Sequence, residues 1–90
     1  MNDAWTVTEI LVSVKAYLWM LKAETDRYKP VKIRVIDALR IGPLKNRSNG
    51  AIEYRFQNIS FVLQSLGKNW VNGYKPAKNV GTVVAKVDVS

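Results

Sequence analysis

The 90-residue chain contains no cysteine and no histidine. Without cysteine it has no disulfide, no thiolate nucleophile and no cysteine-based zinc site. Without histidine it lacks the side chain that most often transfers protons or binds metals near neutral pH. The five glycines, at positions 42, 50, 67, 73 and 81, are scattered and form no phosphate-cradling loop. The composition therefore predicts a domain with no catalytic residues, no metal and no cofactor.

A long apolar run is also missing. The longest lies between Ile10 and Leu21 and is interrupted by Ser13 and Lys15, whereas a membrane-spanning helix needs about 20 apolar residues. The chain starts with an acidic tripeptide, and no basic stretch precedes an apolar one as it would in a signal peptide. We therefore expect no membrane partner and a cytoplasmic location.

Acidic residues are scarce: 7 Asp and Glu face 14 Lys and Arg, so the net charge is +7. With 48% hydrophobic residues, the chain can still bury the core of one small domain. The middle of the chain is the most basic part, because only Asp37 and Glu53 oppose eight bases there: Arg27, Lys29, Lys32, Arg34, Arg40, Lys45, Arg47 and Arg55. This segment is where a polyanion is expected to bind first.

Three stretches are predicted to be helical. The first begins after Thr6, which can form a capping box with Glu9, and extends to about Ala23. Its predicted core stripe consists of Ile10, Val14, Tyr17 and Leu21, widened by Leu11 and Leu18. The second is expected to begin at Pro30 and to stop at Gly42-Pro43. Its β-branched residues also fit a strand, but apolar spacings of three and four favour a helix.

The third helix has the clearest ends, with Ser48 as N-cap and Gly67 as a left-handed terminator. At about 100° per residue, one narrow stripe holds its predicted core residues Ile52, Phe56, Ile59, Leu63 and Leu66. Arg55 falls at the edge of this stripe, where an ion pair with Asp37 is one possibility. The fold class predicted is all-α: a compact helical bundle of helix-turn-helix type with an irregular C-terminal segment.

The chain changes character after Gly67. Turn signals dominate from residue 68, and Trp70 and Tyr74 are expected to fold back onto the helices. We predict a helical DNA-binding domain over residues 1–80. Residues 81–90, which are rich in valine, fit either a strand or the start of a linking helix and are predicted to form a linker or connecting element.

Helix, glycine-proline turn and capped helix follow one another as in a helix-turn-helix, whose second helix reads the major groove. In that arrangement Lys32, Arg40 and Lys45 would hold the DNA backbone. Arg47 and Ser48 lie beside the N-terminus of the third helix, where free N–H groups bind phosphate. The predicted base readers are Asn49, Glu53 and Gln57, since amides pair with adenine and carboxylates accept from cytosine. Asn58 fits either a base reader or a buried hydrogen-bonding residue.

Two motifs carry a resemblance to a known family: Arg47-Ser48-x-x-x-Ile52-Glu53-Tyr54-Arg55-Phe56-Gln57-Asn58-Ile59-Ser60 and Gly73-Tyr74-Lys75-Pro76-Ala77. With Trp5, Glu9, Val14, Tyr17, Met20 and Leu21 they resemble the helical N-terminal module found ahead of HNH-type endonucleases and related proteins of bacterial restriction and defence systems. The resemblance covers residues 5–79, with departures at Ala51, Trp19 and Trp70. It implies the targeting part of a modification-dependent restriction enzyme, with a nuclease domain further along the same parent chain. Recognition of a modified base is a further step that no residue here shows.

Three other functions compete with double-stranded DNA binding. A protein-interaction or dimerisation module would use the face formed by Tyr54, Phe61, Trp70 and Tyr74. Aromatic stacking would suit single-stranded nucleic acid. An enzyme acting alone is the least favoured, because histidine and cysteine are absent. Neither the cognate site nor the oligomeric state follows from the sequence.

Overall fold

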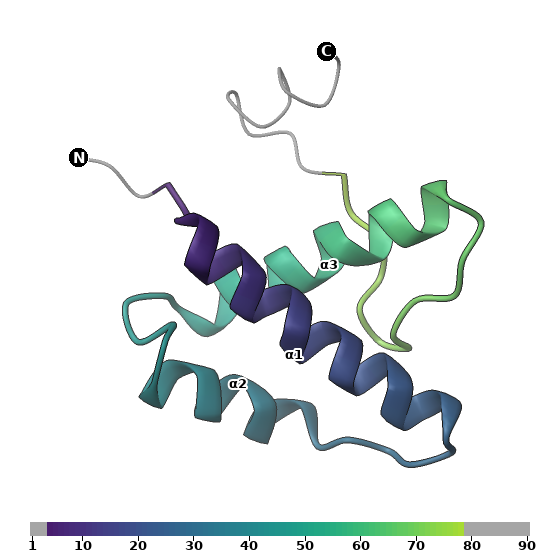
Figure 1. Cartoon of the computed structure of the whole chain (residues 1–90), viewed down its shortest axis with the longest axis horizontal. Helices are drawn as coiled ribbons and strands as arrows, with labels where there is room; N and C mark the ends of the chain where they lie inside the picture. The colour runs from purple at the N-terminus through teal and green to yellow at the C-terminus, as the bar shows by residue number, and fades with distance from the viewer. Residues whose placement is uncertain (1–3, 79–90) are drawn as a thin grey trace.

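The computed structural model describes residues 4–78, which form three helices: α1 (Val7–Thr25), α2 (Lys32–Ile41) and α3 (Asn49–Ser65). In Figure 1, α1 crosses in front of α3, α2 lies below, and the chain after α3 turns back along the bundle. No strand occurs among the described residues. The predicted all-α helical bundle is confirmed. Residues 79–90, including the predicted linker 81–90, lie outside the described residues.

The ends of α1 and α3 are set by local hydrogen bonds. Thr6 and Glu9 form the predicted capping box, with Thr6 N donating to Glu9 Oε1 (2.9 Å) and Glu9 N to Thr6 Oγ1 (3.0 Å). Ser48 caps α3 as predicted, since its Oγ accepts from Ala51 N at 3.1 Å. Gly67 has φ +71° and ends α3 in a Schellman motif, so the predicted terminator is confirmed.

α1 ends two residues later than predicted, at Thr25, with the same hydrogen-bond pattern but without glycine. Tyr28 N donates to Ala23 O (2.7 Å) and Arg27 N to Glu24 O (2.9 Å), while Arg27 takes φ +66°. A side chain at a left-handed position costs about 1 kcal/mol relative to glycine. Two hydrogen bonds to carbonyl groups in the last turn of α1 offset this cost.

The start of α2 differs from the prediction. The helix begins at Lys32, because Val31 is extended (φ −85°, ψ 99°) and its carbonyl accepts the first helical hydrogen bonds from Arg34 N and Val35 N. Pro30 therefore precedes the helix and is buried. The segment is a helix and not a strand, and it stops at Gly42 as predicted.

The hydrophobic core draws on all three helices and on both segments that follow α2 and α3. Its members are Tyr17, Met20, Ile36, Leu39, Leu44, Ile52, Phe56, Val71 and Tyr74. The Phe56 ring lies 6.0 Å from Tyr17 and 5.1 Å from Tyr74, centroid to centroid. Tyr74 thus folds back as predicted. Leu66 was expected in the core stripe but is 63% exposed, because the chain turns away at the end of α3.

The buried face of α1 also differs from the predicted stripe. The side chains buried from this helix are Ser13, Tyr17 and Met20. Leu11 and Leu18 remain 55% and 48% exposed, so the predicted stripe faces solvent over much of its width. The reason is tertiary: the Tyr17 hydroxyl shares a 2.7 Å hydrogen bond with Ser60 Oγ of α3 and accepts from Val71 N at 2.8 Å.

Candidate nucleic-acid interface

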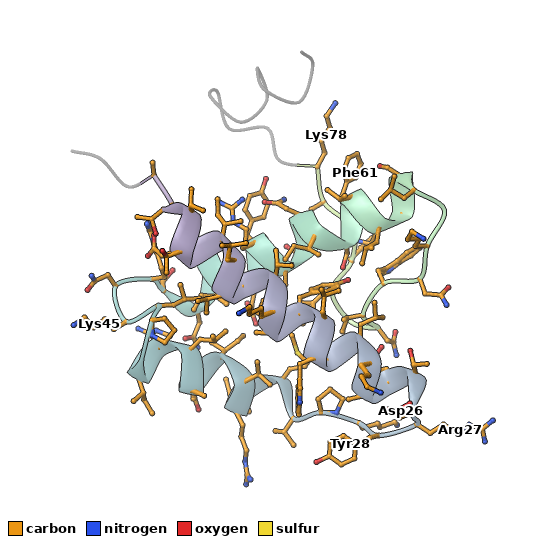
Figure 2. The ribbon with its side chains drawn as sticks, viewed as in Figure 1. Asp26, Arg27, Tyr28, Lys45, Phe61 and Lys78 are labelled. Carbon is orange, nitrogen blue, oxygen red and sulfur yellow. The ribbon has the colours of Figure 1, made fainter. Side chains whose placement is uncertain are left out.

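The connection between α2 and α3 comprises the seven residues 42–48, more than the three or four of a typical helix-turn-helix. Leu44 is fully buried and anchors this connection to the core, and its N–H donates to Leu39 O at 2.8 Å. Lys45, one residue further on, is exposed and projects outward in Figure 2. One side of the connection is therefore held in the core while its basic side faces solvent.

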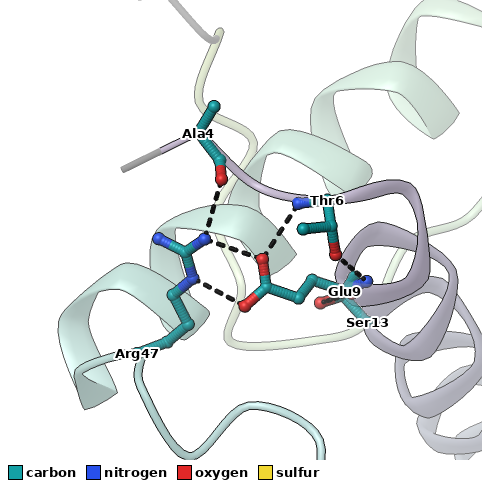
Figure 3. Close-up of polar contacts among 5 residues, drawn as sticks. All are labelled: Ala4, Thr6, Glu9, Ser13 and Arg47. Atoms are coloured by element: carbon teal, nitrogen blue, oxygen red, sulfur yellow. Dashed lines mark hydrogen bonds and ion pairs between the residues drawn. The ribbon is translucent and has the colours of Figure 1, made fainter. Parts of the chain in front are cut away.

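Arg47 ties this connection to the start of α1 (Figure 3). Its Nε donates to Glu9 Oε2 (2.9 Å), and its Nη2 donates to Glu9 Oε1 (2.7 Å) and to Ala4 O (2.9 Å). Both side chains of the pair are only 15% exposed, and the guanidinium carbon lies 4.8 Å from the centre of the Trp5 ring. Arg47, which was predicted to hold phosphate, thus pairs its charge with Glu9 and donates its hydrogen bonds to groups within the protein.

This pairing lowers the pKa of Glu9 from its ordinary value of 4.5 to about 2, first through the Arg47 hydrogen bonds and then through the backbone N–H of Thr6. Because the folded-state pKa is the lower one, ionised Glu9 stabilises the fold above pH 4.5, and this stabilisation is lost as the pH falls toward 2. After allowance for solvent screening we expect about 1–2 kcal/mol of it. Urea unfolding at pH 7, 4 and 2.5 measures the loss, and Glu9→Gln should show a smaller fall over the same range. Equal falls for both proteins would contradict the assignment.

A second guanidinium, that of Arg55, lies over the same Trp5 ring at 4.7 Å. Burial, together with the nearby charge of Arg47, lowers the pKa of Arg55 below its ordinary value. The ion pair with Asp37 that the sequence allowed does not form between these two described residues, since Asp37 is exposed on α2. The Trp5 ring therefore contacts the guanidinium groups of both Arg47 and Arg55 near the N-terminus of α1.

The N-terminus of α3 is open to solvent. Its first turn contains no acidic residue, and Gly50 is exposed, with no atom within 4 Å of where a Cβ would stand. Arg40 is held beside this terminus, because its Nε donates to Arg47 O (2.9 Å) and its Nη1 to Asn49 Oδ1 (2.7 Å). An anion approaching Gly50 would meet backbone N–H groups and an oriented guanidinium.

The other predicted contact residues lie further away. Lys32 is at the opposite end of α2, about 12 Å along the helix from Arg40. There its Nζ lies 3.8 Å from Glu24 Oε2 and 5.8 Å from the centre of the Tyr74 ring. It borders an open pocket of about 530 Å³ lined by Glu24, Arg27, Tyr28, Lys29, Pro30, Lys32 and Asn72. Of the predicted contact residues, Arg40, Ser48 and Asn49 meet at the start of α3, and Lys45 lies on the turn that precedes it.

Part of the outer face of α3 is covered by the segment that returns after the helix. Ala77 N donates to Gln57 O (3.1 Å), Asn58 Nδ2 donates to Ala77 O (2.7 Å), and Tyr54 Oη donates to Lys78 O (3.1 Å). Asn58 is therefore a buried structural residue. Gln57 keeps a half-exposed side chain and Glu53 an exposed one.

Two features of this surface were not predicted. Gly50 carries no recognisable motif, and its importance depends on the empty space around it in the fold. The contact of Trp5 with two arginines joins residues far apart in the chain, and the only signal in the sequence was its position just before a capping box.

Neither the family models, nor the curated proteins, nor the solved structures that were searched contain a match to this chain. The resemblance to the endonuclease module therefore stays a prediction. Over residues 4–78, no helix has the length and apolar character needed to cross a bilayer. In the same range, no three acidic side chains come together in a way that could hold a metal ion.

Proposed function

We propose that this domain binds the phosphate backbone of double-stranded DNA through the start of α3. The observation that carries the proposal is the arrangement of Arg40 beside the exposed Gly50, with Lys45 on the preceding turn. A helix N-terminus attracts anions through its partial positive charge and free N–H groups. Two exposed basic side chains, one beside this helix start and one on the preceding turn, add the sequence-independent attraction that dominates DNA affinity.

Base contacts would come from the adjoining turns of α3. Asn49, Glu53 and Gln57 follow one another at four-residue spacing, which places them on one face of the helix. The Asn49 carbonyl oxygen already accepts from Arg40, so this residue acts in positioning Arg40 as well as in any contact with a base. The segment that covers part of α3 leaves Glu53 as the most exposed candidate for a groove contact.

The proposal includes the wider role implied by the family resemblance. The domain would target a restriction endonuclease to double-stranded DNA in the bacterial cytoplasm, with cleavage by a nuclease domain of the same parent chain. Sensing of modified bases would then depend on the groove contacts and not on Arg40 or Lys45. Binding to duplexes with and without modified cytosine or adenine tests this part directly.

Neutralising the phosphate contacts should weaken binding without regard to sequence. For Arg40→Gln and Lys45→Gln we expect affinity to fall roughly 3- to 10-fold each, and the slope of log affinity against log salt to fall by about 1. Fluorescence anisotropy with labelled duplexes from 50 to 200 mM salt measures both quantities.

Lys68→Gln is the matched control, because it removes one exposed charge just beyond the far end of α3. If Lys68→Gln weakens binding as much as Lys45→Gln does, net charge alone accounts for the attraction and the proposed site is wrong. Absence of duplex binding by the unmodified chain at low salt would also exclude it.

A further inference from the structure

The outer face of α1 carries an apolar stripe that is exposed over most of its length. Val7, Leu11 and Leu18 are 73%, 55% and 48% exposed. Val14 and Leu21, in the same stripe, are half-buried, and Leu21 also packs against the core. In Figure 1 no other described segment lies in front of α1. The fully buried residues of the helix, Ser13, Tyr17 and Met20, lie on a different face, so Val7, Leu11 and Leu18 contribute little to the stability of this domain.

The spacing of the stripe is that of a helix-pairing seam. Its residues follow one another at intervals of four, three, four and three, which are the intervals between the a and d positions of a heptad repeat. Ile10 adjoins it and is 38% exposed. Such a narrow seam matches a partner helix better than a flat surface does, because each side chain can enter a hole between four residues of the facing helix.

The charges beside the stripe indicate what kind of helix fits. In the heptad register, Lys15 and Lys22 occupy the flanking e positions, and both are exposed. Lys22 Nζ already lies 3.0 Å from Asp26 Oδ2, so Lys15 is the main flanking charge that a partner helix would meet. Flanking charges of opposite sign select the partner in helix pairs. The rest of the surface adds to this preference, since the chain carries a net charge of +7.

A second copy of the chain is a poorer match. In an antiparallel pair centred between Val14 and Leu18, Lys15 of one copy would face Lys15 of the other, and like charges in contact are unfavourable. In a parallel pair, Lys15 would face Ile10 and leave its charge without a partner. Both arrangements would also bring together two chains of strong positive charge.

We propose that the α1 stripe binds an amphipathic helix with leucine-type residues at its seam and acidic residues beside it. The probe is a synthetic four-heptad peptide with Leu at a and d and Glu at e and g, and its control carries Lys in place of Glu. Fluorescence anisotropy of the labelled peptides should show binding of the Glu peptide to the full chain, with the Lys peptide at least ~10-fold weaker.

Variants locate the contact. Leu11→Ser combined with Leu18→Ser should weaken binding of the Glu peptide at least ~10-fold, whereas Ile41→Ser, on α2 and 84% exposed, should leave it unchanged. All of these residues are largely exposed, so circular dichroism should show the same helix content and melting temperature in each variant. Lys15→Glu should shift the preference from the Glu peptide toward the Lys peptide.

Several results would overturn the proposal. Equal binding of the two peptides would show that charge does not select the partner. Equal losses of affinity in the α1 and α2 variants would show that the peptide does not bind at the α1 stripe. A concentration-dependent dimer in sedimentation velocity, abolished by the Leu11/Leu18 variant without any peptide binding, would assign the stripe to a second copy. Cosedimentation with phosphatidylglycerol-containing vesicles but not with pure phosphatidylcholine vesicles, again without peptide binding, would assign it to an anionic membrane.

Discussion

Arg47→Met is expected to destabilise the domain by about 3 kcal/mol, because it leaves the carboxylate of Glu9 mostly buried without its ionic partner. Methionine keeps most of the apolar stem, so the loss reports on the guanidinium and its contacts with Glu9, Ala4 and Trp5. Urea unfolding at pH 7 measures the change in the free energy of unfolding. Arg34→Met, an exposed position on α2, should change it by less than about 0.5 kcal/mol.

A double variant separates the ion pair from the other roles of Arg47. Glu9→Gln keeps a side chain that can complete the capping box with Thr6 but removes the negative charge. Combined with Arg47→Met, it should recover about 1–2 kcal/mol of the loss, since no unpaired charge then remains. If Arg47→Met costs no more than Arg34→Met, the pair does not hold the turn in place.

This result also bears on DNA binding. Because the Arg47 guanidinium pairs with Glu9, Arg47→Met is expected to weaken duplex affinity less than Lys45→Gln does when both are measured under conditions where each variant is folded. Lys45→Gln should show the reverse pattern, with full stability and reduced affinity. Lys45 and Arg47, two positions apart in the predicted binding segment, thus have different expected roles.

Tyr17→Phe is expected to cost about 2–3 kcal/mol, although it removes only one oxygen atom. The lost hydroxyl accepts from Val71 N and shares a hydrogen bond with Ser60 Oγ, and all three residues are buried. Each buried group left without a partner costs about 1–3 kcal/mol. The ring itself still packs against Phe56, so no large cavity forms.

Amide hydrogen exchange distinguishes this cause from a general loss of packing. The Val71 N–H should exchange faster in Tyr17→Phe than the global change in stability explains, because it has lost its acceptor. Tyr28→Phe is the matched control, since Tyr28 is 61% exposed and should change stability by less than about 0.5 kcal/mol. Uniform acceleration of all amides would mean that the hydroxyl has no specific role at Val71.

Several features of the fold follow from short stretches of sequence. The capping box of Thr6 and Glu9, the Ser48 cap and the Gly67 terminator all depend on groups no more than four or five residues apart. The start of α2 was placed wrongly at Pro30, because the conformation of Val31 has no marker in the sequence. Local chemistry therefore predicted three helices, together with most of their ends.

The predicted binding residues divide in the same way. Arg40, Ser48 and Asn49 meet at the start of α3, and Lys45 lies on the turn that precedes it, because all four are close in sequence to that helix end. Lys32 lies apart because a straight helix separates it from the others. The position of Gln57 beside the returning segment depends on Ala77, twenty residues further on, which no helical periodicity could reveal.

The sequence by itself determined that this is a small, basic, three-helix domain whose third helix begins with a serine cap after a basic turn. The tertiary structure decided which face of α1 is buried, through a hydrogen bond between Tyr17 and Ser60, 43 residues apart. It also turned Arg47 inward, through Glu9, 38 residues away. A helix cap forms between residues within one turn of each other, so the sequence predicts it. A helix with apolar residues on two faces buries the face whose polar groups find partners on distant segments, and only the tertiary structure determines which face that is.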